Sequence, residues 1–121
     1  MVHINTMKKN ILLVNIFGPN RDDPNFYANL NEKIAKLGIP NLVLAGDLNL
    51  VLDPTLDYCN YKRQNNVKAL EKVEEIIADY CLVDSWRELN PQIQFFTWRQ
   101  TNLLQQSRLD FFYFLKTSVT L

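Results

Sequence analysis

The first long hydrophobic segment covers residues 11–17 and ends in the turn residues Gly18-Pro19-Asn20. A near-continuous apolar run of this length is typical of a strand that is buried on both faces of a sheet. We therefore expect a central strand there. A second apolar run over residues 42–45 follows Pro40 and predicts another buried strand, whose end at Gly46-Asp47 should open onto a cleft.

A helix is predicted between these two strands. Asp23 is a capping residue, and Pro24 suits the first helical position. Apolar residues then recur at spacings of four, four and three before Gly38, at Phe26, Leu30, Ile34 and Leu37. Strand, helix and strand in this order form the unit that gives adjacent strands in a layered α/β fold.

The second half of the chain contains another amphipathic helix, which Asn66 can cap. Its apolar stripe faces away from a charged side and consists of Val67, Leu70, Val73, Ile77 and Tyr80. Residues 52–65 show no regular spacing of apolar residues, and this predicts a loop that is functional or mobile. A turn at Pro91 and strands over residues 95–98 and 108–115 complete the predicted elements.

Composition narrows the classes of protein to consider. The 121 residues supply one domain or part of one, and 13 Lys+Arg balance 13 Asp+Glu. This balance excludes a binder of nucleic acid or membranes that works by overall positive charge. The chain has no run of 18 apolar residues and no secretion-signal pattern, so we expect an intracellular protein, cytoplasmic or nuclear, with no membrane partner.

The cysteines and the histidine offer little chemistry. Cys59 and Cys81 are a poor disulfide framework, and we expect both to be buried without a disulfide partner. With His3 as the single histidine, no zinc set can be assembled. His3 is expected to be a terminal residue without a catalytic role.

Two acidic positions are candidates for catalysis. Asp47 and Asn49 follow the buried strand at residues 42–45, although both could simply be turn formers. Asp110 lies among large apolar residues, which predicts a partly buried carboxylate that needs a partner. A strand face turned toward solvent would also explain Asp110.

Four motifs occur in an order that resembles the endonuclease/exonuclease/phosphatase superfamily, which includes exonuclease III, abasic-site endonucleases, DNase I and inositol phosphatases. They are Asn15-Ile16-Phe17-Gly18-Pro19-Asn20, Gly46-Asp47-Leu48-Asn49, Phe96-Thr97-Trp98 and Ser107-Arg108-Leu109-Asp110-Phe111. Within the superfamily, residues 18–26, 52–54 and 84–91 look like the endonuclease domain of LINE-type retrotransposons. The match covers about residues 11–115.

The resemblance implies an α/β fold, a partial four-layer α/β sandwich of the DNase I-like type, with residues 1–121 as one partial domain. The family's early motifs, an Asn and a metal-binding Glu, and its final histidine motif are expected outside these residues. Half of a sandwich would leave apolar surface uncovered and open to aggregation or partner binding.

The resemblance also implies roles for individual residues. Asp47 would orient or deprotonate the attacking water, and Asn49 would donate a hydrogen bond to the phosphate. Asp110 corresponds to the acid that hydrogen-bonds a catalytic histidine. Contacts to phosphate or DNA are implied for Asn20, Thr97 and Arg108, although Thr97 could equally be a plain strand residue. We expect Asp47, Asn49, Asn20 and Asp110 to converge in space.

The implied function is a fragment of a Mg²⁺-dependent phosphodiesterase that nicks DNA, inactive alone. Asp47, Asn49 and Asp110 by themselves make a poor ligand set for Mg²⁺, which requires octahedral oxygen coordination. Phe17 replaces a family Tyr and lacks its hydroxyl donor, which would slow catalysis without abolishing it. The alternative is a non-catalytic remnant that binds a partner. An inositol or lipid phosphatase is disfavoured by residues 84–91.

Overall fold

A computed structural model describes residues 1–5, 10–59, 66–101 and 105–115. Three helices lie within these residues: α1 (Pro24–Leu37), α2 (Val67–Asp79) and α3 (Ser85–Leu89). The strands described are β1 (Val2–Asn5), β2 (Asn10–Phe17), β3 (Asn41–Asp47), β4 (Tyr58–Cys59), β5 (Leu82–Asp84), β6 (Trp98–Arg99), β7 (Gln106–Ser107) and β8 (Asp110–Leu115).

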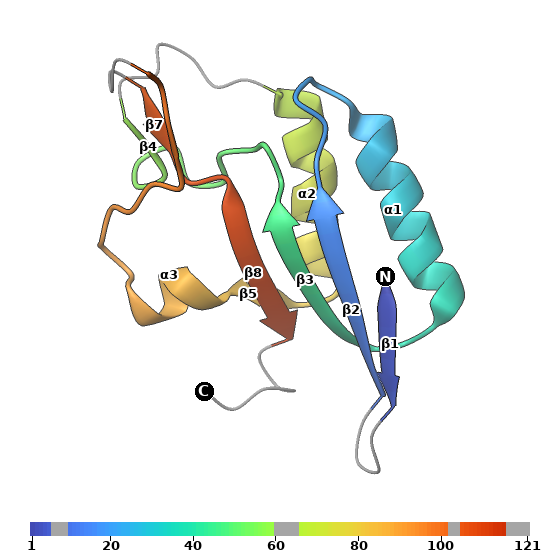
Figure 1. The fold of residues 1–121 in the computed structure, drawn as a ribbon. Helices are drawn as coiled ribbons and strands as arrows, with labels where there is room; N and C mark the ends of the chain where they lie inside the picture. Colours follow the sequence, from blue (N-terminus) through green and yellow to red (C-terminus); the bar gives the residue numbers. More distant parts are fainter. Residues whose placement is uncertain (6–9, 60–65, 102–104, 116–121) are drawn as a thin grey trace.

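The main sheet has five strands in the order β1-β2-β3-β8-β5 (Figure 1). β2 and β3 are parallel and are joined through α1, which confirms the predicted strand, helix and strand unit. The other neighbouring pairs are antiparallel. β4, β7 and β6 form a separate small sheet. β1 was not predicted, because four residues at the start of the chain give too short a pattern.

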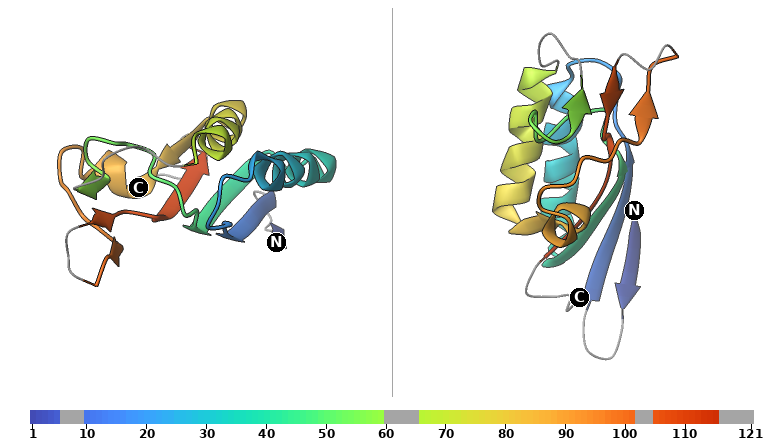
Figure 2. Two further views of the ribbon diagram at one scale, coloured as in Figure 1. Left: turned by 90° about the horizontal axis from the view of Figure 1, so that it is seen from above. Right: turned by 90° about the vertical axis from the view of Figure 1, so that its left-hand side faces the viewer.

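The helices α1 and α2 cover one face of the main sheet, and no described element covers most of the other face (Figure 2). The core lies between this sheet and the helices and includes Leu12, Val14 and Ile16 from β2. On the opposite side of β2, Leu13 is half-buried, Asn15 is exposed and Phe17 is 80% exposed. The prediction that this strand is buried on both faces was therefore wrong, because the second face has no covering layer among the described residues.

The ends of α1 agree with the sequence signals. The Asp23 carboxylate accepts a hydrogen bond from the amide of Phe26 at 3.1 Å, and Gly38 ends the helix in the left-handed region with φ 62°. The buried stripe agrees with the prediction at Ile34, but Tyr27 is buried in place of Phe26, which is 37% exposed, and Leu37 is 50% exposed. The Tyr27 hydroxyl donates to the Leu48 carbonyl at 2.7 Å, which holds Tyr27 against the core.

The second predicted helix is confirmed as α2, but its cap is not the expected residue. Asn66 adopts φ 58°, and its side chain makes no capping hydrogen bond. The Asp22 carboxylate instead accepts from the amides of Ala69 at 2.8 Å and Lys68 at 3.4 Å. This cap links α2 to the loop that follows β2.

Several shorter predictions need correction. Of the predicted strand at residues 95–98, only Trp98 lies in a strand, β6, and Phe95 is exposed in irregular chain. The cysteines are free thiols, but Cys59 is half-buried and Cys81 is exposed, so neither is fully buried. Cys81 occupies a tight turn with φ 51° between α2 and β5.

The predicted loop at residues 52–65 contains β4, and its residues 60–65 lie outside the described part. No helix among the described residues combines the length and the apolar character that crossing a membrane requires.

Asp22→Ala should lower the free energy of unfolding by about 1 kcal/mol, because it removes the capping acceptor of α2. Asn66→Gly should not destabilise the protein, since glycine adopts the left-handed conformation without strain. Urea denaturation of both variants measures the difference. A larger loss in Asn66→Gly than in Asp22→Ala would show that Asn66 is the cap.

Candidate functional site

The candidate site lies at the end of β3, where Gly46 allows an unusually close approach of two strands. Gly46 has φ 123° and lies beside Ile16 of β2. A Cβ atom at this position would approach the Ile16 carbonyl oxygen within 2.1 Å, too close for any other residue. Glycine is therefore required here for β2 and β3 to remain paired up to Asp47.

Asp47 and Asp110 lie directly opposite each other in the sheet. Asp47 ends β3, Asp110 begins β8, and the two are register partners in the antiparallel pair. Phe17 on β2 is the register partner of Asp47 on the other side. Side chains of register partners point to the same face, so Phe17, Asp47 and Asp110 form one row on the uncovered face of the sheet.

Asn49 is held in a turn that starts from Asp47. The Asp47 carboxylate accepts a hydrogen bond from the Asn49 amide at 2.8 Å, and Asn49 adopts φ 52°. The Asn49 side-chain Nδ2 donates to the carbonyl of Gly18 at 2.5 Å. These bonds fix Asn49 next to Asp47, as expected of turn-forming residues, and leave the second Asn49 Nδ2–H available.

The environment of Asp47 disfavours its charge. Burial raises the pKa of the Asp47 carboxyl above its usual value of 3.8, the hydrogen bond from the Asn49 amide lowers it, and the negative charge of Asp110 raises it. The net direction is upward. Asp110 itself is exposed, so the prediction of a partly buried carboxylate was wrong; the strand face turned toward solvent is the observed arrangement.

Hydrogen bonds hold the loop after β2 at two points, one at this site and one at the start of α2. The Gly18 amide donates to the Asp47 carbonyl at 2.7 Å, and Asp22 caps α2. Asn20 lies between these anchors with an exposed side chain, which has no hydrogen-bond partner among the described residues. The structure therefore brings Asp47, Asn49 and Asp110 together and places Asn20 in the adjacent loop with an exposed side chain.

Thr97 holds the start of β8. Its Oγ1 accepts hydrogen bonds from the amides of Leu109 at 3.0 Å and Asp110 at 3.3 Å. Thr97 is exposed and lines a hollow of about 240 Å³ beside Asp110, together with Trp86, Phe95 and Phe112. Thr97 thus contacts the backbone of Asp110 directly.

Arg108 occupies a different environment from the one expected of a DNA contact. It is 2% exposed, and its guanidinium donates to Asp57 at 2.8 Å and to Asp84 at 2.5 Å. Asp57 also accepts from Arg87 at 2.6 Å. Burial alone would lower the pKa of Arg108, but the hydrogen bonds and charges of Asp84 and Asp57 raise it above its usual value. The guanidinium is therefore engaged inside the protein and not at the surface.

Sequence patterns contain little sign of this ion-pair network. Asp57 is fully buried within the loop that showed no period, where an acid looks like any other turn residue. Asp84 and Arg87 belong to residues 84–91, whose sequence resembles LINE-type endonucleases but does not indicate an ion pair. Two acids and two arginines at unrelated spacings can be identified as partners only when the fold brings them together.

Donors for a metal ion are few. Across residues 1–5, 10–59, 66–101 and 105–115, no group of three or more His, Cys, Asp or Glu side chains is arranged to hold a metal ion. Asp47 and Asp110 provide two carboxylates in one row. The described donors thus do not fit a resident Mg²⁺, which requires more oxygen ligands than this pair supplies.

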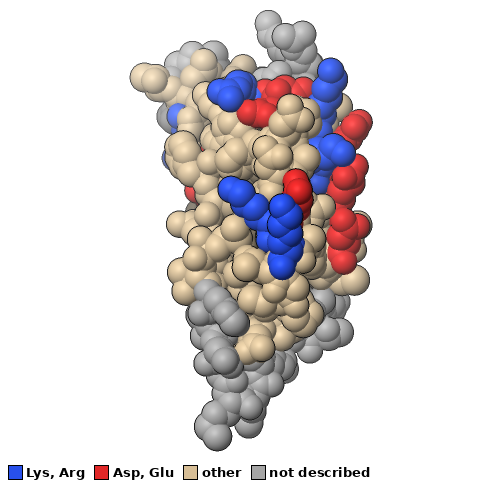
Figure 3. Space-filling view, turned by 90° about the vertical axis from the view of Figure 1, so that its right-hand side faces the viewer, with Lys and Arg blue, Asp and Glu red and all other residues tan. Residues whose placement is uncertain are grey.

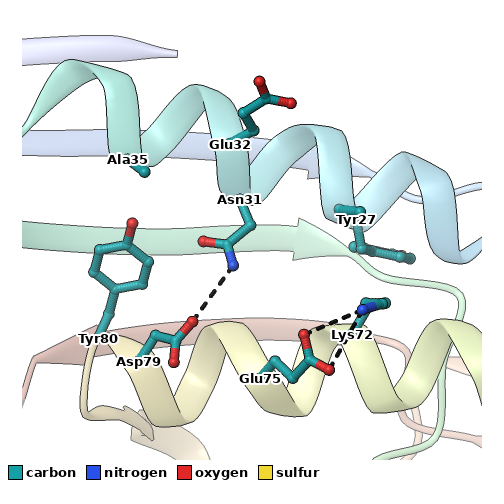
Figure 4. A pocket seen from close by; sticks show the side chains of 9 residues that line it. Tyr27, Asn31, Glu32, Ala35, Lys72, Glu75, Asp79 and Tyr80 are labelled. Carbon is teal, nitrogen blue, oxygen red and sulfur yellow. Dashed lines mark hydrogen bonds and ion pairs between the residues drawn. The ribbon is translucent and has the colours of Figure 1, made fainter.

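A second hollow lies on the helix side of the molecule. A groove of about 410 Å³ lies between α1 and α2, and four of its polar side chains form two pairs (Figure 4). Asn31 donates to Asp79 at 3.5 Å, and Lys72 pairs with Glu75 at 3.4 Å. The side of the molecule in Figure 3 carries charges of both signs close together, in agreement with the balanced composition.

No family model matches the chain. A 149 kDa protein of transposon TX1 from Xenopus laevis is 30% identical over 106 residues, which are 84% of this chain and 8% of that protein. The similarity thus links the chain to a small part of a transposon-encoded protein.

Solved structures share the fold. The Neisseria 3′ phosphatase NExo bound to a product DNA hairpin has a TM-score of 0.67 at 18% identity, over 95% of this chain and 51% of that chain. The 3′-5′ exonuclease NExo from Neisseria meningitidis has a TM-score of 0.67 at 19% identity, over 95% of this chain and 52% of that chain. The Xenopus laevis APE2 catalytic domain has a TM-score of 0.65 at 23% identity, over 90% of this chain and 41% of that chain.

The chain thus spans about half of these structures or less. The fold that the resemblance implied, a partial DNase I-like α/β sandwich, is confirmed. The transposon relative agrees with the resemblance to LINE-type endonucleases.

Asp47→Asn should stabilise the protein at neutral pH by roughly 0.5 kcal/mol, because like charges opposite each other in a sheet are destabilising. The raised pKa means that the folded state favours the protonated acid. The stability from Asp47 is thus fully present below the pKa of the unfolded chain and is lost as pH rises through the folded pKa.

Denaturation of the wild type and Asp47→Asn across pH checks this expectation. The free energies of unfolding of the two proteins should become equal below about pH 3, where Asp47 is protonated in both the folded and the unfolded state. When Asp110 is also replaced by Asn, Asp47→Asn should increase the free energy of unfolding by less than it does in the wild type. A wild type that is more stable than Asp47→Asn at neutral pH would contradict the account.

Arg108→Leu should lower the free energy of unfolding by about 3–5 kcal/mol, because Asp57 and Asp84 would lose their main cation in a buried site. The control is Arg21→Ala, which removes an exposed arginine paired with Asp23 and should cost less than about 0.5 kcal/mol. Urea denaturation measures both. Similar losses in the two variants would show that the buried network contributes no more than a surface pair.

Proposed function

We propose that the chain is part of a DNA phosphodiesterase of the retrotransposon endonuclease type, and that residues 1–121 form part of one such domain. The observation that carries this proposal is the row of Asp47 and Asp110 at one end of the sheet, with Asn49 fixed beside it. The DNA hairpin bound by one structure of the same fold and the transposon relative support DNA as the substrate.

Each residue of the row has a role in this proposal. Asp47 orients the attacking water and accepts its proton, a task for which a raised pKa is favourable. Asn49 uses its second Nδ2–H to donate to a phosphate oxygen as negative charge develops there. Asp110, which is exposed and held by Thr97, provides the carboxylate for a cationic partner that completes the site.

The contacts to the phosphate backbone come from the loop after β2. Asn20 is exposed between two anchored points, so it can reach a phosphate without rearrangement of the loop. Thr97 acts by positioning Asp110 at the rim of the neighbouring hollow. Arg108 acts within the protein, through Asp57 and Asp84.

The chain alone is inactive in this proposal. Phe17 occupies the row without a hydroxyl donor, and the described carboxylates do not fit a resident Mg²⁺. The metal and the cationic partner of Asp110 are thus required from outside the described residues. The scarcity of metal ligands also favours a second candidate function, a non-catalytic domain remnant.

A plasmid-nicking assay with Mg²⁺ should show no cleavage by the chain above the level of Asp47→Ala, because essential groups are absent. Nicking by the wild type that Asp47→Ala abolishes would overturn the proposed inactivity while supporting the assignment of Asp47.

A segment exchange tests the proposed activity itself. Residues 11–115 should replace the matching segment in the corresponding part of the transposon TX1 protein, provided that the unmodified TX1 part nicks DNA with Mg²⁺. We expect the exchanged protein to retain nicking and to lose at least ~100-fold with Asp47→Ala, the scale on which loss of one catalytic group acts. An exchanged protein that melts cooperatively but does not nick would favour the non-catalytic remnant.

A further inference from the structure

One peptide unit connects the candidate site to α1. The peptide between Leu48 and Asn49 carries two polar groups, the Leu48 carbonyl and the Asn49 amide. The carbonyl accepts the hydrogen bond from the Tyr27 hydroxyl at 2.7 Å, and the amide donates to the Asp47 carboxylate at 2.8 Å. A peptide unit is planar and rigid, so a bond that fixes its carbonyl also sets the direction of its amide.

Tyr27 is a donor that does not change with pH near neutrality. Its side chain is 1% exposed, and its ring packs edge-on against Phe26 with the ring centroids 5.0 Å apart. Burial raises the pKa of the Tyr27 hydroxyl, and the negative charges of Asp47 and Asp23 raise it further. The hydroxyl therefore stays protonated over the whole pH range in which Asp47 changes its charge.

Gly18 leaves the space in which the hydrogen bond from Tyr27 forms. A Cβ atom at Gly18 would lie within 3.0 Å of both the Tyr27 hydroxyl and the Leu48 carbonyl oxygen. The Gly18 backbone also binds this turn twice, because its amide donates to the Asp47 carbonyl and its carbonyl accepts from Asn49 Nδ2. A side chain at this position would therefore push the Tyr27 hydroxyl and the Leu48 carbonyl apart.

The turn needs such support because Asn49 adopts φ 52°, a left-handed conformation that is unfavourable for a residue with a side chain. Leu48 is 1% exposed, and its amide donates to the Leu109 carbonyl at 2.9 Å. The backbone of Leu48 is thus bound on both sides, to the residue before β8 through its amide and to α1 through its carbonyl.

We propose that Tyr27 is a positioning residue of the candidate site, which aims the Asn49 amide at the Asp47 carboxylate by holding the Leu48 carbonyl. The proposal rests on the proposed function, because this positioning serves catalysis only if Asp47 and Asn49 act on a phosphate. Tyr27 itself is buried and acts through the turn. The hydrogen bond from the Asn49 amide lowers the pKa of Asp47, so the orientation of this peptide also influences the charge of the proposed base.

Tyr27→Phe tests the proposal, because it removes the hydroxyl and keeps the ring. NMR titration should give a higher pKa for the Asp47 carboxyl than in the wild type, since the bond from the Asn49 amide is weakened. Hydrogen exchange of the Asn49 amide should become on the order of tenfold faster, the factor that corresponds to one lost hydrogen bond. The amide of the buried Leu44 in β3 is the reference, because a general loss of stability would accelerate both amides equally.

Tyr80→Phe is the matched control. Tyr80 lies at the opposite end of the groove between α1 and α2 from Tyr27 (Figure 4). This variant loses the same hydroxyl group and should leave the Asp47 pKa and the exchange of the Asn49 amide as in the wild type. Gly18→Ala is a second test variant, which should change both quantities in the same direction as Tyr27→Phe and replaces it if it does not fold.

Either of two results would overturn the proposal. One is an Asp47 pKa that does not rise in Tyr27→Phe, and the other is an Asn49 amide whose exchange accelerates no more than that of Leu44. Neither measurement requires nuclease activity, so a failure here is distinct from a failure of the exchanged protein to nick DNA.

Discussion

The structure around the candidate site depends on the buried guanidinium of Arg108. Its ion pairs with Asp57 and Asp84 join the loop after β3, the end of β5 and the short connection between β7 and β8. The Arg108 amide also donates to the Asp57 carbonyl at 2.8 Å, so both the side chain and the backbone of Arg108 are bound to Asp57. Charges buried to this extent are tolerated only when they are paired and hydrogen-bonded. The network therefore fixes where β8 begins, and with it the position of Asp110.

Two further constraints define the site from this starting point. Gly46 lets β2 and β3 remain in contact up to Asp47, because no Cβ is present to meet the Ile16 carbonyl. Thr97 binds the Asp110 amide, so both carboxylates of the pair are set by the backbone. Asp110 is nevertheless exposed, and the face that carries the pair is uncovered. The geometry thus provides one side of a site, which agrees with a chain that spans about half of the NExo structures.

Local patterns in the sequence predict much of this fold. The helices α1 and α2 have apolar stripes and end signals, and β2, β3 and β8 have long apolar runs that identify them as strands. Contacts between distant residues could not be predicted. Asp22 caps a helix that begins 45 positions later, whereas the sequence pattern indicated Asn66, the residue directly before the helix, as the cap. The exposure of Asp110 depends on whether a second layer covers the sheet, which periodicity within one strand cannot decide.

The central claim is that Asp47 and Asp110, far apart in the sequence, face each other as one carboxylate pair. NMR titration of the Asp47 carboxyl carbon, in the wild type and in Asp110→Asn, measures this directly. Removing the neighbouring negative charge should lower the pKa of Asp47, because the charge of Asp110 contributes to its raised value. An Asp47 pKa that is the same in both proteins would show that the two side chains do not interact, and it would contradict the account of the site.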